Sequence, residues 1–136
     1  MHDTGIIDNY VRWLETLTES GVHRVGMFAA RDIRYRTPEG EGCGANATAA
    51  IYARMFADGA TVKTKILDRA TGQDERTVYL RWDRIVTTRT GQIHGLSGMS
   101  EILIGMEGKI VSIIEHWNSV SEAPKHNFIT RWLKRK

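Results

Sequence analysis

The chain has 136 residues, of which 41% are hydrophobic and 26% charged, so it is long enough for one domain with a single buried core. No apolar run approaches the ~20 residues of a membrane-spanning helix, and residues 1–5 lack the basic-then-apolar pattern of a signal peptide. We therefore expect a cytoplasmic protein. Cys43 is the only cysteine, which excludes an internal disulfide and a cysteine-based metal cluster.

The formal net charge of +3 belongs to the C-terminal end of the chain. Residues 125–136 contain five lysines and arginines and no acidic residue. The remaining 14 basic and 16 acidic residues leave a net charge of −2. A nucleic-acid-binding protein usually carries a basic stripe over its folded body, and zinc-finger spacings and glycine-rich phosphate loops are both absent from the sequence. No nucleic-acid partner is expected.

Helical patterns dominate the first 60 residues. Apolar residues recur at helical spacing from Ile6 to Leu17, and Gly21 follows as a helix end. A strand pattern stops at Pro38, and the alanine-rich stretch after it favours helix. The predicted elements are a helix over about 4–19, a short helix over 22–30, a strand over 32–37, a loop over 38–44 and a helix over 47–57.

From residue 60 the apolar pattern switches to the period of two that is typical of strands. The predicted strands cover 62–67, 76–89, 92–104 and 109–118. Helices placed before such an antiparallel meander indicate an α+β fold with helices against one sheet face. A curled sheet capped by helices forms a cone with a cavity inside. The domain is expected over 1–123, followed by a short basic amphipathic helix over 124–136.

Two charged residues stand two positions apart on the predicted second sheet strand. Arg81 and Asp83 point to one face of this strand, and Leu80 and Trp82 point to the other. A carboxylate pair formed by Asp83 and Glu115 beside an arginine is a plausible acid/base device, because repulsion raises one pKa and the cation lowers the other. The alternative is a solvated sheet face with an ordinary cross-strand salt bridge. Both interpretations stay open at this point.

The order of the elements, together with several short motifs, resembles the nuclear-transport-factor-2-like superfamily and in particular its SnoaL-like polyketide cyclase branch. The motifs lie in residues 10–14, 27–38, 44–56, 95–97 and 108–118. The resemblance implies a curved antiparallel sheet with N-terminal helices, the cone-shaped roll of this superfamily. It implies either a cofactor-independent acid/base enzyme of the hydrolase, isomerase, cyclase or dehydratase type, or a binding module without catalysis. We expect no cofactor and no metal.

One enzyme branch can be compared residue by residue. Limonene-epoxide-hydrolase-like enzymes use Arg-x-Asp on one strand and a second Asp at the end of the last strand, and Arg81, Asp83 and Glu115 match these positions. Tyr35 matches a tyrosine that helps to hold the water. The companion asparagine is Thr37 here, and the second carboxylate is Glu instead of Asp. The resemblance thus implies Asp83 and Glu115 as acid/base pair, Arg81 as positioning cation and Tyr35 as donor.

A second branch fits less well. Ketosteroid-isomerase-like enzymes need a tyrosine, matched by Tyr10, and an aspartate base, whose position falls on Thr37. Threonine cannot take a carbon-bound proton, and the second donor falls near Ser100, so the chain differs from a steroid isomerase. Several further side chains are predicted either to shape a pocket for a small, mostly apolar molecule or to belong to the core. These candidates for substrate binding are Tyr10, Trp13, Thr37, Tyr79 and Trp117.

Two further expectations concern partners. We expect a homodimer formed through the outer sheet face. The basic end of the chain has two interpretations: a helix that docks Phe128 and Trp132 on the domain, or weak adhesion to an anionic membrane surface. Two helical turns are too short for stable anchoring, so docking is favoured.

Overall fold

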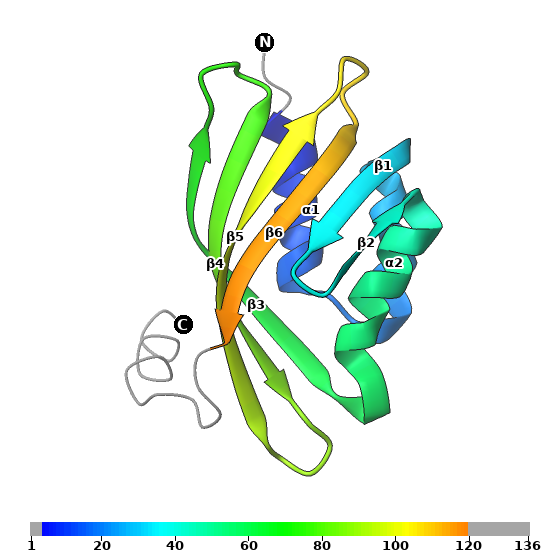
Figure 1. Ribbon diagram of the computed structural model, residues 1–136, viewed down its shortest axis with the longest axis vertical. Helices are drawn as coiled ribbons and strands as arrows, with labels where there is room; N and C mark the ends of the chain where they lie inside the picture. The colour runs from blue at the N-terminus through cyan, green and yellow to red at the C-terminus, as the bar shows by residue number, and fades with distance from the viewer. Residues whose placement is uncertain (1–3, 120–136) are drawn as a thin grey trace.

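The computed structural model describes residues 4–119 of the chain. The helix predicted over 124–136 and the docking predicted for it lie outside these residues. Within residues 4–119, two α-helices, two 3-10 helices and six strands follow one another (Figure 1). In chain order they are α1 (Thr4–Glu15), η1 (Glu19–Met27), β1 (Ala29–Thr37), β2 (Gly40–Cys43), α2 (Ala45–Ala53), η2 (Arg54–Gly59), β3 (Thr61–Thr71), β4 (Thr77–Thr87), β5 (Ile93–Ile104) and β6 (Ile110–Ser119).

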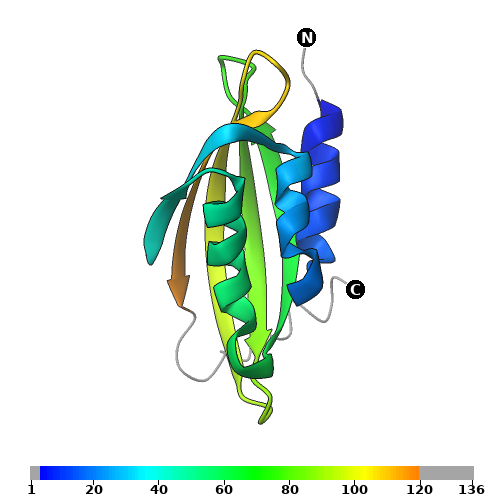
Figure 2. The same cartoon turned by 90° about the vertical axis from the view of Figure 1, so that its right-hand side faces the viewer.

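The six strands form one curved sheet in the order β2-β1-β6-β5-β4-β3. Figure 2 shows α1, η1 and α2 side by side over one face of this sheet. The predicted α+β fold is therefore confirmed. The expectation of a purely antiparallel sheet needs one correction, because β1 pairs with β6 in parallel. These two strands are far apart in sequence, so no hairpin turn forces them to run in opposite directions.

The sequence-based element boundaries differ from the structure at several places. The first predicted helix ends at Glu15, four residues earlier than expected, and the second corresponds to the 3-10 helix η1, which begins at Glu19. The indole N–H of Trp13 donates to the carbonyl of Gly21 in η1 at 2.9 Å. The predicted loop over 38–44 contains β2, because Thr37 pairs with Gly40 across a two-residue turn. The Thr37 hydroxyl oxygen accepts the backbone N–H of Glu39 in this turn. β3 runs four residues beyond the predicted strand end at residue 67, as far as Thr71.

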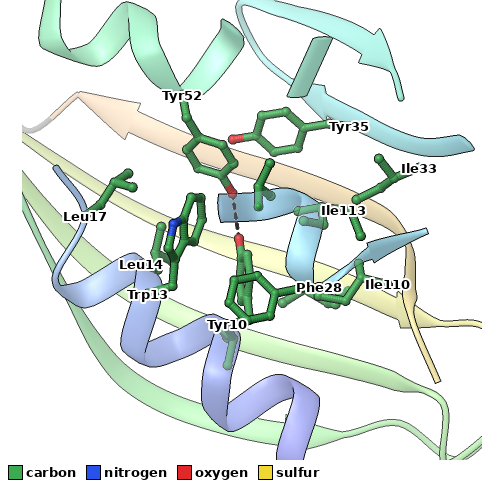
Figure 3. Packing of buried hydrophobic residues seen from close by; sticks show 14 of the residues in the cluster. Tyr10, Trp13, Leu14, Leu17, Phe28, Ile33, Tyr35, Tyr52, Ile110 and Ile113 are labelled. Atoms are coloured by element: carbon green, nitrogen blue, oxygen red, sulfur yellow. Dashed lines mark hydrogen bonds between the residues drawn. The ribbon is translucent and has the colours of Figure 1, made fainter. Parts of the chain in front are cut away.

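Strand register decides which side chains face the helices. Leu80 on β4, Ser100 on β5 and Glu115 on β6 lie opposite one another in one row across the sheet. The neighbouring row on the same face contains Trp82, Gly98 and Trp117. A Cβ atom on Gly98 would lie 2.6 Å from the Trp82 ring, so glycine leaves the space that this indole occupies. This inner face is buried, and Figure 3 shows how its side chains pack with those of the helices.

The outer sheet face carries a different set of side chains. Tyr79 and Met99 are 36% and 48% exposed there, and His116 lies opposite Met99 across β5 and β6. These side chains border a surface hollow of about 460 Å³. The homodimer expected through this face stays a prediction. None of the helices between residues 4 and 119 has the length and apolarity needed to cross a membrane.

Candidate functional site

A buried carboxylate stands at the centre of the inner face. Glu115 is 1% exposed, and both of its carboxylate oxygens accept hydrogen bonds. The Tyr35 hydroxyl donates to Oε1 at 2.6 Å, and the Ser100 hydroxyl donates to Oε2 at 3.0 Å. The indole N–H of Trp82 donates to the Ser100 hydroxyl oxygen at 2.9 Å. This network supplies the partners that a buried carboxylate needs, and it fixes the position of Glu115.

Three tyrosines from three different elements meet beside Glu115. The hydroxyls of Tyr10 on α1 and Tyr52 on α2 are 2.6 Å apart, and the Tyr52 ring stacks on Tyr35 of β1 at 4.9 Å between centroids (Figure 3). Burial is the main cause that raises the pKa of all three well above 10, and the nearby Glu115 charge raises them further. The three phenols are therefore neutral at physiological pH, and the Tyr35 hydroxyl uses its proton in the hydrogen bond to Glu115.

These raised pKa values predict an alkaline transition. Because the fold favours the neutral phenols of Tyr10, Tyr35 and Tyr52, their contribution to stability is complete below about pH 10 and is lost as the pH rises above it. In an absorbance titration these three tyrosines should form phenolate only together with loss of the fold, followed by circular dichroism. Ionisation of all the tyrosines near pH 10 with the fold intact would contradict this arrangement.

An arginine also lies on the inner face. Arg84 follows Leu80 and Trp82 on the same side of β4 and is 1% exposed. Its Nε donates to the Thr64 hydroxyl at 2.8 Å, and its guanidinium carbon lies 4.1 Å from the centroid of the Trp82 ring. Nη1 lies 3.6 Å from the sulfur of Met55, and Nη2 has no hydrogen-bond partner.

A cavity of about 140 Å³ opens between the inner face of the sheet and α2–η2. We call it the Arg84 cavity. Its wall is mainly apolar, with Tyr35 and Arg84 as buried polar groups and two exposed charges at the rim. The lining residues are Tyr35, Glu39, Ile51, Arg54, Met55, Arg84, Leu96 and Trp117. A cavity of this size holds a molecule of about the size of benzene.

The structure does not bring Arg81, Asp83 and Glu115 together. Asp83 lies opposite Ser97, whereas Glu115 lies opposite Ser100. Ser97 and Ser100 are three residues apart on β5, so Asp83 and Glu115 point to opposite faces of the sheet. Arg81 is exposed on the outer face, and Asp83, although buried, accepts the Ser97 hydroxyl there at 2.8 Å. The expected convergence of the two carboxylates on one water is therefore wrong. Of the four residues predicted to be catalytic, Tyr35 and Glu115 are in contact.

The residues predicted to bind substrate occupy different environments. Trp117 lines the Arg84 cavity. Tyr10 and Trp13 belong to the buried core between α1 and the sheet. Thr37 lies in the turn before β2, where its hydroxyl donates to the carbonyl of Gly40. Tyr79 lies on the outer face.

Sequence analysis missed two residues of this site, Arg84 and Tyr52. A signal for Arg84 was present, because it follows the apolar Leu80 and Trp82 at intervals of two residues on one strand. Its side chain must therefore lie on the same face as theirs. Tyr52 lies in an alanine-rich helix with no distinctive motif, so its contact with Tyr10 depends on tertiary packing. Among residues 4–119, no group of three or more histidine, cysteine, aspartate or glutamate side chains is placed to hold a metal ion.

Comparisons with known proteins give a structural match only. No family model and no curated protein matches the sequence. A nuclear-transport-factor-2-like protein of unknown function from Exiguobacterium superposes with a TM-score of 0.70 at 16% identity, over 83% of this chain and 98% of its own. A SnoaL-like family protein from Agrobacterium tumefaciens gives 0.61 at 17%, over 85% and 96%. An epoxide hydrolase of the limonene type from Mycobacterium tuberculosis gives 0.64 at 12%, over 83% and 76%.

Other solved structures that match most of the chain include a ketosteroid isomerase from a Mycobacterium species and a Mycobacterium tuberculosis protein in complex with an estradiol hemisuccinate. The fold is thus that of a class of proteins in which helices cover one face of a curved sheet, and some members of this class are enzymes. More specifically, the chain has the fold of the nuclear-transport-factor-2-like superfamily, with SnoaL-like and epoxide-hydrolase-like neighbours, as the sequence motifs predicted.

Proposed function

We propose that the protein is a cofactor-independent acid/base enzyme, of the hydrolase, isomerase or cyclase kind, that acts on a small, mostly apolar molecule in the Arg84 cavity. One observation carries this proposal. Tyr35 lines the cavity, and its hydroxyl is bonded at 2.6 Å to the buried carboxylate of Glu115. A proton acceptor is therefore connected to the cavity through a single side chain.

The direction of that hydrogen bond defines the chemistry. Because the Tyr35 hydroxyl donates to Glu115, its oxygen keeps lone pairs that can accept a proton from a substrate or a water. When Tyr35 accepts that proton, its own proton passes to Glu115, and no free phenolate is formed. This relay agrees with the raised pKa of Tyr35, which burial causes and the charge of Glu115 increases. General acid/base catalysis of this kind contributes about 10²–10⁴-fold to a rate.

The structural neighbours support the same class of function. They include an epoxide hydrolase/cyclase-like enzyme of pyran ring formation, an epoxide hydrolase and a ketosteroid isomerase. These activities share proton transfer to or from a small organic molecule. Since fold does not determine function, the proposal depends on Tyr35 and Glu115 and not on the neighbours alone.

A second candidate function is ligand binding without catalysis. The observation that favours it is the position of Glu115, which is absent from the cavity wall and has both oxygens already engaged by Tyr35 and Ser100. Under this alternative the carboxylate anchors the wall of a binding pocket. The two candidates differ in turnover, not in binding.

Tyr35→Phe tests the proposal. The ring keeps its stacking on Tyr52 while the link between the cavity and Glu115 is lost, so we expect turnover to fall about 10²-fold with little change in ligand affinity. The measurement is a panel of small epoxides and lactones, assayed for product and for binding. Tyr79→Phe is the matched control, because Tyr79 lies on the outer face and its loss should leave turnover unchanged. Binding by the wild-type protein with no turnover across the panel would favour the ligand-binding alternative.

A further inference from the structure

Arg84 is a buried cation whose hydrogen-bond partners within residues 4–119 are neutral. Arginine is rarely buried without an acidic partner, because removing its charge from water costs several kcal/mol. Arg84 is 1% exposed, yet no carboxylate among residues 4–119 forms an ion pair with it. Its protein partners are the neutral Thr64 hydroxyl, the Met55 sulfur and the Trp82 ring. None of these groups carries a compensating charge.

The Nη2 atom of Arg84 lacks a hydrogen-bond partner, and Arg84 is one of the residues that line a cavity. This cavity is the Arg84 cavity described above, and the Nη2 atom is itself buried. Thr64 and Trp82 hold the rest of the guanidinium, at Nε and over its carbon, so the group cannot readily turn away to find another partner. A fixed guanidinium with a free N–H edge is suited to an oxygen anion, above all to a planar carboxylate.

The remaining wall fits an apolar body attached to such an anion. Ile51, Leu96 and Trp117 provide apolar surface, and the volume of about 140 Å³ accepts a ring or a short chain. The charged groups at the rim are Arg54, which adds a second cation, and Glu39, which opposes it. Because both rim residues are exposed, water screens them far more than it screens Arg84. The buried carboxylate of the same face, Glu115, does not line the cavity and is covered by the Tyr35 hydroxyl that donates to it. Arg84 is therefore the buried charge that a ligand in the cavity meets first.

We propose that Arg84 binds the oxyanion, foremost the carboxylate, of a small apolar acid whose body lies in the Arg84 cavity. The proposal rests on the same cavity as the proposed function and names the substrate class for it. It depends on binding alone and needs neither Tyr35 nor Glu115 to transfer a proton. An inorganic oxyanion offers the same charged group without the apolar body, so the two sources can be separated by measurement.

The test uses benzoate and its neutral isostere benzamide as probes of the full chain at neutral pH. Calorimetry or nuclear magnetic resonance titration should show benzoate binding at least tenfold more tightly than benzamide, and phosphate or sulfate binding more weakly than benzoate. Arg84→Met replaces the cation with an unbranched apolar side chain, so the preference for benzoate should disappear. Arg81→Met is the matched control, because Arg81 is exposed on the outer face. It should keep the preference.

A measurement on the wild-type protein guards against a variant that fails to fold. Benzoate should raise the melting temperature more than benzamide at equal concentration, since a ligand that binds only the folded state stabilises it. Equal binding of benzoate and benzamide, or tighter binding of phosphate than of benzoate, would overturn the proposal. Benzoate binding through Arg84 in a protein that turns over no substrate would contradict the acid/base function and leave this inference intact.

Discussion

Glu115→Gln is expected to lower turnover by about 10²–10⁴-fold while the protein stays folded. Glutamine has nearly the same size as glutamate, and its amide oxygen can still accept the Tyr35 hydroxyl. Its amide nitrogen can donate to the Ser100 oxygen, which has a second lone pair beside the one that accepts Trp82. The variant therefore keeps side-chain contacts to Tyr35 and Ser100, with the direction of the Ser100 hydrogen bond reversed, and it cannot take up a proton. Steady-state kinetics and thermal melting measure the two effects separately.

Asp83→Asn is the matched comparison for this variant. It makes the same carboxylate-to-amide change at Asp83, which is also buried but lies on the outer face next to Ser97. If the site is built on Glu115 and Tyr35, Asp83→Asn should keep turnover within a few fold of the wild type. Loss of turnover in a folded Asp83→Asn protein, with turnover retained in Glu115→Gln, would mean that the chemistry uses the outer face and that the site described above is wrong.

Strand alternation predicted the relative orientation of neighbouring residues correctly. Leu80 and Trp82 share one face of β4, and Arg81 and Asp83 share the other, as their spacing indicated. Alternation could not show whether Glu115 on β6 lies on the same sheet face as Asp83 on β4. That relation depends on the register through β5, where Asp83 lies opposite Ser97 and Glu115 lies opposite Ser100. The strand sequences alone do not define register, since it also depends on turns and on the irregularity between Leu103 and Ile104.

Polarity also misled the prediction of the site. Arg84 and Glu115 are charged, yet both lie on the apolar face, where Thr64, Ser100 and Tyr35 satisfy part of their hydrogen bonding. These partners are far apart in sequence, so a pattern confined to one strand cannot reveal them. The family motif had the same limitation, because an Arg-x-Asp spacing keeps both residues on one face without defining which face is inside. The order of elements was a stronger guide, and it predicted the fold.

Trp82→Ala is expected to destabilise the domain by about 3–5 kcal/mol. The indole is fully buried, packs near Trp117 and fills the space above Gly98. Its removal leaves a cavity and also removes the donor to Ser100. Chemical denaturation followed by circular dichroism measures the change in the free energy of unfolding. Trp82→Phe, which keeps an aromatic ring and loses the N–H group, should cost clearly less.

The same pair of variants connects stability to the Arg84 cavity. The Trp82 ring holds the guanidinium of Arg84, with its central carbon 4.1 Å from the ring centroid, so a variant without a ring leaves the cation less fixed. Trp82→Phe should keep the preference for benzoate over benzamide, because a ring still lies beneath Arg84. Trp82→Ala should weaken the preference even under conditions where the protein is fully folded. If both variants bind benzoate as the wild type does, Trp82 contributes only packing, and Arg84 is positioned by Thr64 alone.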